Sequence, residues 1–421
     1  MSFQQGLSGL NVASAALDTI GNNVANSGTV GYKLSTAQFA DVFAASLSGA
    51  GTSPIGLGSK VSTIAQQFTQ GNVSSTSNPL DMAINGGGFF RLQNATGDVV
   101  YSRNGQFQLD KNGNIVNAKG QELMGYPLDA TGKLSTNLGV LRLFDPNSAS
   151  DNAPVATGGT TGSKGVQLNV NLDSGASVIT GAVNPSDSTT YNKSTTVTVY
   201  DSLGNSHSMF VYFQKTAANV WSVSANLDGI TPSATTTMSL GSLTFGTDGT
   251  LTLPATGVVT PQPSFAVTTG ALTPLAFDLN LSNSTQYGSA FTVNSVAQDG
   301  YASGKLAGFN IGTDGVITGR YTNGQSKPLG QVALANFRNP QGMQPLGDNT
   351  WAATSDSGAE MTGVPGSSGQ YGPVQSSALE DSNVDLTKEL VDMIVQQRVY
   401  QANAQTIKTQ DQVLQTLVNL R

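Results

Sequence analysis

Few side chains in this sequence could carry out chemistry. Among its 421 residues the chain has one histidine, His207, and no cysteine. A Cys–His pair is therefore excluded, and a Ser–His–Asp triad could form only around His207, which has no acidic residue beside it. We expect His207 to be an ordinary strand or surface residue. Because the acidic residues also form no paired-carboxylate pattern, the sequence predicts a protein that is not an enzyme and that holds no metal and no cofactor.

Two short motifs resemble ligand-binding loops but lack essential residues. Residues 110–114, Asp-Lys-Asn-Gly-Asn, have neither the ligand spacing of a calcium loop nor its downstream glutamate, so they predict a turn. The glycine run at 85–90 lacks the Lys-Ser/Thr of a phosphate-binding loop. Turns of the form Asp-x-x-Gly or x-Asp-Gly recur between strand-like runs and predict hairpins. They lie within 109–116, 128–135, 200–207, 245–252 and 311–318.

The composition excludes several classes of partner. Charged residues make up 11% of the chain, the formal net charge is −7, and 49 residues are glycine. An acidic chain without a basic patch is not expected to bind nucleic acid. Because no apolar run approaches the ~20 residues of a membrane span, we expect no membrane insertion. The N-terminal residues show no cleavable signal peptide.

The sequence predicts a long helix over residues 385–421, a segment that contains neither glycine nor proline. Asp385 stands at the expected N-cap and Glu389 in the first turn. A narrow stripe with alternating spacings of three and four indicates a coiled-coil seam that requires a partner. The seam residues are Leu390, Met393, Tyr400, Ala404, Ile407, Leu414 and Val418. The alternative is an ordinary terminal helix packed on its own domain.

The N-terminal segment has a matching stripe. Its residues are Phe3, Leu7, Leu10, Leu17 and Val24. We therefore expect residues 1–32 and 383–421 to form a helical, coiled-coil-like inner domain. Between them, residues 35–49 have helical spacing, and residues 33–70 and 371–382 are expected to be connecting segments. A hinge is predicted at the glycines of residues 49–58, which are Gly49, Gly51, Gly56 and Gly58.

The rest of the chain is predicted to be β-structure. Short strand-like runs separated by turns place a first β domain at 71–144 and 284–370. The composition shifts to Ser, Thr, Ala and Gly near Asp145, which indicates a second, inserted β domain at 145–283. The predicted fold is thus multidomain α+β, with paired terminal helices and two mainly antiparallel all-β domains, the second inserted in the first.

Several segments carry a family resemblance. Residues 21–33, GNNVANSGTVGYK, resemble the N-terminal signature of bacterial flagellar axial proteins, the rod, hook and hook–filament junction families. The motifs at 80–90, 101–127, 346–354 and 378–421 resemble further segments of the rod and hook proteins, so the likeness covers about two-thirds of the chain. The family motif residues are Asn22, Asn23, Asn26, Gly31, Tyr32 and Lys33. The inserted β domain is similar to that of the hook members.

The resemblance implies a structural subunit that self-assembles into a tubular helical polymer outside the cell. This polymer would be a flexible universal joint that passes torque from rod to filament and encloses an export channel. The implied partners are further copies of the chain, the distal rod protein, the hook cap, the hook–filament junction protein, the hook-length control protein and the flagellar type III export apparatus. Phe39 and Phe43 resemble an export motif, although packing explains them equally well.

Two other functions remain open from the sequence. A distal rod protein of the same family would share the terminal signatures, and the inserted domain is what distinguishes it from a hook subunit. A secreted β-rich adhesin would need its terminal helices for something other than self-assembly.

Overall fold

The computed structural model describes residues 2–42, 56, 58–129, 132–146, 152–159, 165–229 and 237–419. The chain forms two compact units, and the second interrupts the first in the sequence. Unit 1 contains Met1–Asn147, Gly308–Arg320 and Ser326–Arg421, and unit 2 contains Ser148–Ala307 and Tyr321–Gln325.

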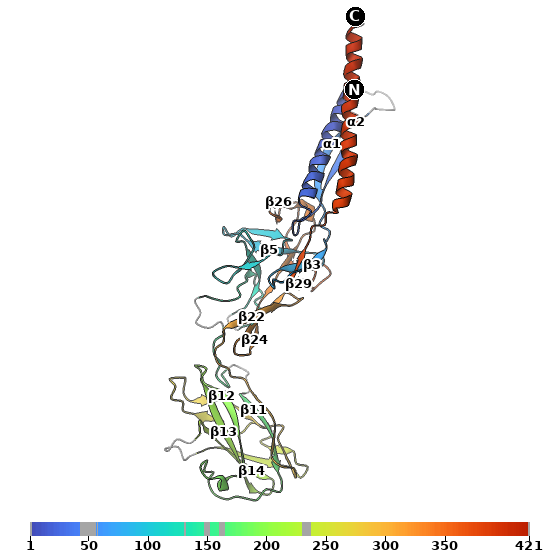
Figure 1. The fold of residues 1–421 in the computed structure, drawn as a ribbon. Coiled ribbons are helices and arrows are strands. Elements are labelled where there is room, and N and C mark those ends of the chain that lie inside the picture. The colour runs from blue at the N-terminus through green and yellow to red at the C-terminus, as the bar shows by residue number, and fades with distance from the viewer. Residues whose placement is uncertain are drawn as a thin grey trace. The chain divides into compact units, whose positions relative to one another are not determined.

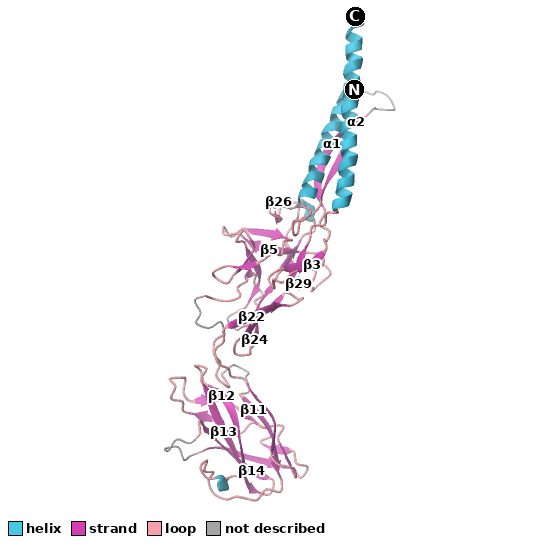
Figure 2. Cartoon of the chain, in the orientation of Figure 1, coloured by secondary structure: helices cyan, strands magenta, loops and turns pink. Residues whose placement is uncertain are grey.

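Two terminal helices pack together in unit 1, as predicted. They are α1, Ser2–Ala25, and α2, Leu386–Asn419 (Figures 1 and 2). The pair is antiparallel, because Gly6 near the start of α1 lies against Ile407 of α2, while Asn23 near its end lies against Glu389. The Asp385 carboxylate accepts hydrogen bonds from the backbone N–H groups of Thr387 and Lys388, as expected of an N-cap.

A β-hairpin lies beside α1. It consists of β1, Ser35–Val42, and β2, Gly58–Gln66, which pair antiparallel with a bulge after Gln38. The helical spacing expected from residue 35 onward is therefore wrong over 35–42. The physical reason is pairing: each residue of β1 has a partner in β2, so tertiary hydrogen bonding overrides a weak local periodicity.

The β part of unit 1 is built around one large sheet whose strands differ in length. Within the described residues it has thirteen strands, and its main path runs β22-β23-β24-β9-β5-β6-β27-β26. The strands of this sheet are β5 Phe89–Gln93, β6 Val99–Ser102, β7 Gln108–Leu109, β8 Ile115–Val116, β9 Glu122–Pro127, β10 Gly139–Val140, β22 Leu306–Ile311, β23 Val316–Tyr321, β24 Ser326–Val332, β25 Leu334–Asn336, β26 Gln344–Gly347, β27 Thr350–Ala352 and β28 Met361–Gly363. A 3-10 turn at Pro340–Gly342 precedes β26.

Two smaller sheets join the start and the end of the β part. β3, Val73–Ser75, pairs with β30, Ala378–Glu380, and β4, Met82–Ile84, pairs with β29, Val374–Ser376. Residues 371–382, expected to be a connecting segment, therefore supply two strands. These two ladders join β29 and β30 to strands that lie nearly 300 positions earlier in the chain.

Aromatic side chains form one core of unit 1. Phe89, Tyr101, Phe337 and Trp351 are buried together, with Phe68 packed against them. Phe68 and Phe89 each meet Trp351 edge to face, with ring centroids 5.5 and 5.9 Å apart. Such pairs stabilise by about 0.5–1.5 kcal/mol beyond the apolar area that they bury.

Unit 2 contains two main sheets. One is antiparallel, in the order β12-β13-β14-β15-β16, and in the other β11 pairs parallel with β19 and β20 and antiparallel with β21. Its strands are β11 Val166–Asp173, β12 Lys193–Tyr200, β13 Ser206–Ala217, β14 Val220–Leu227, β15 Met238–Phe245, β16 Leu251–Leu253, β17 Ser264–Phe265, β18 Leu275–Ala276, β19 Leu279–Asn280, β20 Thr285–Tyr287 and β21 Thr292–Gln298. A 3-10 turn covers Ser188–Thr190.

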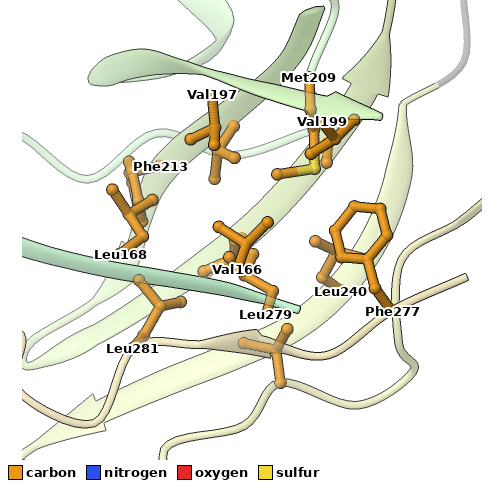
Figure 3. Packing of buried hydrophobic residues seen from close by; sticks show 14 of the residues in the cluster. Val166, Leu168, Val197, Val199, Met209, Phe213, Leu240, Phe277, Leu279 and Leu281 are labelled. Atoms are coloured by element: carbon orange, nitrogen blue, oxygen red, sulfur yellow. The ribbon is translucent and has the colours of Figure 1, made fainter. Parts of the chain in front are cut away.

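The core of unit 2 lies between these sheets. Alternate residues of β11 and β12 point inward, so Val166 and Leu168 face Val197 and Val199 (Figure 3). Trp221 is fully buried in the same cluster, and its indole N–H donates to the Gln286 amide oxygen at 2.9 Å. The alternation of apolar and polar residues in these strands is what makes a sheet with one buried face.

Residues 284–307 are predicted from the sequence to lie in the first β domain, whereas in the structure β20 and β21 pair with β11 of unit 2. The predicted hairpins at 109–116, 200–207 and 245–252 connect β7–β8, β12–β13 and β15–β16. At 110–114 the chain forms a turn, in which the Asp110 carboxylate accepts from the backbone N–H of Asn112 and of Asn114.

Candidate assembly surface and its buried anchor

Small side chains allow α1 to approach α2 closely. A Cβ added at Gly9 would lie 2.7 Å from Asn403 Oδ1, and one added at Gly6 would lie 3.1 Å from Ile407 Cγ1. The residues of α1 that are buried are also small or polar: Gly6, Ala13, Ala16, Thr19 and Asn23. The contact between the helices therefore buries few large apolar side chains, and most of the large apolar side chains of α1 and α2 remain at least partly exposed.

The predicted seam residues divide between two environments. In α2, Met393, Ala404 and Ile407 are half-buried, whereas Leu390, Tyr400 and Leu414 are exposed, and nothing is described for the side chain of Val418. In α1, Leu10, Leu17 and Val24 are half-buried, whereas Phe3 and Leu7 are exposed. The structure thus brings only part of each stripe into the contact between the two helices.

A second apolar flank of α2 was missed by the sequence analysis. Val391, Val395 and Val399 recur every four residues and are exposed, with Val391 55% and Val395 49% accessible. The spacing of four residues between these valines is visible in the sequence, but it lies beside the single stripe from which the seam is predicted. The large apolar residues of α2 that are exposed are Leu386, Leu390, Val391, Ile394, Val395, Val399, Tyr400, Val413 and Leu414. So many exposed large apolar side chains along one helix indicate an interaction surface.

The base of the helix pair is held by Asn23. Its side-chain amide donates to the Ser35 carbonyl at 2.8 Å and to Glu389 Oε2 at 3.0 Å, while its Oδ1 accepts from the Ser35 N–H and the Tyr32 hydroxyl. Asn22 accepts hydrogen bonds from the Asn26 amide and from Tyr32. Asn23 therefore connects α1, β1 and the first turn of α2 through one buried side chain.

Gly31 and Lys33 complete the predicted motif. Gly31 has φ +69°, and a Cβ there would lie 2.7 Å from the Asn104 backbone nitrogen, so only glycine fits without strain. The Gly31 N–H donates to the Glu380 carbonyl at 2.8 Å. Lys33 is fully buried, and its Nζ donates to Glu380 Oε1 at 2.6 Å and to the Thr69 carbonyl at 2.8 Å.

Glu380 is the centre of a buried charge cluster. Besides Lys33, it accepts from Arg103 Nη1 at 3.1 Å and from the Gly71 N–H at 2.9 Å. The Arg103 guanidinium also lies over the Phe89 ring, 5.3 Å from its centroid. Burial lowers the pKa of Lys33 and of Arg103, and the Glu380 carboxylate opposes that shift in both. We name Lys33, Arg103 and Glu380 the buried anchor.

The predicted hinge and export residues lie partly outside the described residues, which do not include Gly49, Gly51 and Phe43. Gly56 and Gly58 lie against α1, because the Gln5 side chain donates to the Gly56 carbonyl at 2.7 Å and a Cβ at Gly58 would clash with Ser8. A hinge at these glycines stays a prediction. Phe39 of β1 is 41% exposed, which leaves both its export role and a packing role as predictions.

The single histidine has two acidic partners, so the expectation that it is an ordinary residue without one is wrong. His207 is buried, and its Nδ1 and Nε2 lie 2.6 Å from Asp228 Oδ2 and 3.2 Å from Asp201 Oδ2. The sequence separates these residues by 6 and 21 positions, so only the β12–β13–β14 pairing brings them together. Asp201 also accepts from the Thr269 hydroxyl at 2.6 Å, which anchors the turn after β12 to a distant loop.

Among the residues that the structure describes, His, Asp and Glu side chains nowhere gather in a way that could hold a metal ion. Likewise, neither described helix is long and apolar enough to cross a membrane. The arrangement of unit 1, with an anchored helix pair that exposes apolar flanks, suits recognition of another protein surface.

Four family models match consecutive parts of the chain. They are the flagella basal body rod protein family over residues 3–33, the flagellar hook protein FlgE/F/G D1 domain over 83–180, the flagellar basal body protein FlaE D2 domain over 171–301, and the flagellar basal body rod FlgEFG protein C-terminal family over 375–420. The first and last of these matches fall on the two terminal helices.

Full-length relatives decide the family. The chain is 45% identical to the flagellar hook protein FlgE of Salmonella typhimurium over 426 aligned residues, which cover 100% of both chains. It is 44% identical to that of Escherichia coli K12, again over 100% of both chains, and 36% identical to that of Rhizobium meliloti over 100% of this chain and 98% of the relative. This chain belongs to the flagellar hook protein FlgE family.

A solved structure agrees with the fold. The crystal structure of the Helicobacter pylori flagellar hook protein FlgE2 superposes with a TM-score of 0.51 at 13% sequence identity, covering 73% of this chain and 100% of that one. At this identity the likeness concerns the fold alone. Membership of the FlgE family confirms the main prediction from the sequence, a structural subunit of the flagellar hook that self-assembles as an axial protein.

Proposed function

We propose that this FlgE-family chain polymerises through its terminal helices into a tubular helical hook, which passes torque from rod to filament as a flexible joint around a central export channel. The observation that carries this proposal is the row of large exposed apolar residues along α2. Each buried Val, Leu or Ile side chain stabilises by about 1.5–3 kcal/mol, so a helix that exposes eight of them, together with Tyr400, gains strongly from a neighbour.

The polymer requires a contact between unlike surfaces of identical subunits. Such heterologous contacts generate rings or open helices, depending on whether the rotation closes. Two features support this geometry. The helix pair is fixed to the β part of unit 1 by Asn23 and the buried anchor, so a contact made by α2 moves the β part with it. The surface also carries few charges, 11% of all residues, which limits repulsion between copies.

The remaining partners and the location follow from the family and are part of the proposal. We propose that the chain lies outside the cell, that it is exported by the flagellar type III apparatus without a cleaved signal peptide, and that it contacts the distal rod protein, the hook cap, the hook–filament junction protein and the hook-length control protein. Full-length identity with relatives named hook protein supports this assignment over a distal rod protein. A deletion strain with complete rods but no hooks would distinguish the two.

The direct test is assembly of variants of the full chain. Leu414 is 55% exposed, so an aspartate there should leave the melting temperature of the monomer unchanged. In the polymer the charge would be desolvated without a partner in every subunit, so Leu414→Asp should abolish assembly. Leu414→Met keeps the apolar volume and should polymerise like the natural chain. Normal assembly of Leu414→Asp, measured by sedimentation and electron microscopy, would remove α2 from the proposed interface.

A further inference from the structure

Within the described residues, the helix pair carries two unpaired charges on its outer sides: Asp18 lies on the side of α1 away from α2, and Arg398 lies on the side of α2 away from α1. Asp18 is the single charged residue of α1. It is exposed, and among the described residues it has no hydrogen-bond or ion-pair partner. By helical geometry it lies roughly 160° around α1 from the residues that meet α2. Arg398 of α2 is also exposed and without such a partner in the described part of the chain, and it lies roughly 170° around α2 from the residues that meet α1. The two cannot pair within one chain.

Asp18 lies at the rim of a cavity. The cavity has a volume of about 280 Å³ and lies between α1 and the β1–β2 hairpin, on the side of α1 away from α2. Its lining residues are Ala15, Asp18, Thr19, Asn22, Ser35 and Ile64. Ile64 is 54% exposed there, so the cavity presents an apolar wall and one carboxylate.

The hairpin extends the apolar part of this site. The cross-strand pairs Ala37–Ile64 and Phe39–Val61 place their side chains on one face, because the bulge after Gln38 shifts the register between them. Phe39 and Val61 are exposed, like Ile64. We name the surface formed by Asp18, Phe39, Val61 and Ile64 the hairpin groove.

Arg398 is surrounded by matching chemistry. Val391, Val395 and Ala402 lie seven, three and four residues from it, so they share its flank of α2. All three are exposed. We name Val391, Val395, Arg398 and Ala402 the valine flank. It offers two valines, one alanine and one guanidinium, and the hairpin groove offers an apolar wall with one carboxylate.

From this complementarity we propose that the valine flank of α2 docks into the hairpin groove of a second copy of the chain, with Arg398 of one copy paired with Asp18 of the next. The proposal rests on the proposed function and gives its contact a register. The contact is heterologous, since it joins a flank of α2 to a groove beside α1, and it therefore repeats from copy to copy in a polymer.

A charge swap in the full chain tests the pair. Asp18→Arg and Arg398→Asp should each place two like charges together at every contact and lower the polymer yield by about tenfold or more, which corresponds to ~1.4 kcal/mol. The double variant Asp18→Arg/Arg398→Asp should restore assembly, because each contact again joins one cation and one anion. Lys408→Asp makes the same change of charge on a different flank of α2, roughly 80° around the helix, and should assemble like the natural chain.

The outcomes separate this inference from the proposed function. Both charges are exposed in the monomer, so the melting temperatures of all variants should match and a loss of polymer should reflect the contact. If the single variants assemble normally, or if the double variant assembles no better than the weaker single one, the pairing is wrong. The proposed function would survive that result as long as the natural chain polymerises and Leu414→Asp does not. Failure of the natural chain to polymerise would overturn both.

Discussion

At the scale of single residues, Glu380 determines how the two ends of the chain are joined. Its carboxylate is fully buried and accepts hydrogen bonds from Lys33, Arg103 and the Gly71 backbone. Two cations face one anion, and Lys33 Nζ and Arg103 Nη2 also donate to the Thr69 and Gly86 carbonyls. The three side chains keep these partners only while all of them stay in place, which fixes the turn after α1 to the strand before α2.

We predict that Glu380→Gln destabilises unit 1 by about 3–5 kcal/mol, because two buried cations lose their counter-charge. The chain has two tryptophans, of which Trp351 lies in unit 1 and Trp221 in unit 2. Urea unfolding followed by Trp351 fluorescence in a Trp221→Phe background measures the effect. Asp348→Asn is the matched control, because it breaks the exposed pair with Lys119 and should cost at most about 1 kcal/mol. Equal effects of the two variants would contradict the buried anchor.

His207 should make the stability of unit 2 depend on pH. Burial lowers the pKa of His207, but the hydrogen bonds to Asp228 and Asp201 outweigh that effect and raise the pKa above its ordinary value of 6.5. Burial raises the pKa of Asp201, but hydrogen bonds from Thr269, Asn205 and His207 hold it well below its ordinary value of 3.8. The protonated imidazole is therefore the form that the folded unit favours.

These two pKa shifts determine how the stability of unit 2 changes with pH. The His207 contribution is complete below about pH 6.5 and is lost as the pH rises through the raised pKa, whereas the Asp201 contribution is complete above about pH 3.8 and is lost as the pH falls through the lowered one. We predict that the unfolding midpoint of unit 2, read by Trp221 in a Trp351→Phe background, declines as the pH rises above 6.5 and through the raised pKa of His207. In His207→Gln this decline should be absent. An unchanged decline would assign it to other groups.

At the scale of elements, the helix pair combines a close contact with large free flanks. Gly6 and Gly9 let α1 approach Ile407 and Asn403, while the valines of α2 stay exposed. α2 also continues past the N-terminal end of α1 (Figure 1). Because helices in proteins gain most of their stability from packing, we expect the part of α2 that has no contact with α1 to be the least stable segment of the monomer.

We predict different results for glycine-to-alanine substitution at two positions of α1. A Cβ at Gly21 has nothing within 4 Å, so Gly21→Ala should raise the stability of the helix by roughly 1 kcal/mol. At Gly9 the same Cβ would lie 2.7–2.9 Å from the Asn403 side chain, so Gly9→Ala must displace it and should gain less or lose stability. Circular dichroism of the monomer during thermal unfolding measures both. An equal gain at the two positions would contradict the close approach of the helices.

At the scale of the whole molecule, the chain consists of two compact units with separate cores. The core of unit 2 contains residues from 166 to 281. The aromatic core of unit 1 contains residues on both sides of this segment, from Phe89 to Trp351. A segment with a complete core of its own is a candidate for an inserted domain, which is how we interpret unit 2.

We predict that replacing residues 148–307 by a short Gly-Ser linker leaves unit 1 folded. The unfolding transition that Trp351 reports should keep its cooperativity, because its core and the buried anchor lie outside the replaced segment. The matched control is a chain in which β11 alone, Val166–Asp173, is deleted, which should disrupt unit 2 and leave the Trp351 transition in place. Loss of the Trp351 transition in the linker variant would show that the units fold together.

The sequence by itself determined the elements whose signals are local. The terminal helices followed from a spacing of three and four, supported in the C-terminal one by the absence of glycine and proline. The N-cap followed from Asp385, and the hairpin turns followed from their Asp-x-x-Gly pattern. The family followed from motifs of consecutive residues such as 21–33. These features depend on neighbours a few positions apart, where backbone geometry and capping act directly.

Only the tertiary structure decided how distant residues meet. The strand at residues 35–42 depends on pairing with β2, the partners of His207 on the order of strands, and the buried anchor on Glu380 lying beside a lysine 347 positions earlier. The division of α2 into a face for α1 and a free valine flank also depends on the position of α1, because several apolar stripes of one helix satisfy the same periodicity. Long-range burial selects among them, and the spacing of the residues does not contain that choice.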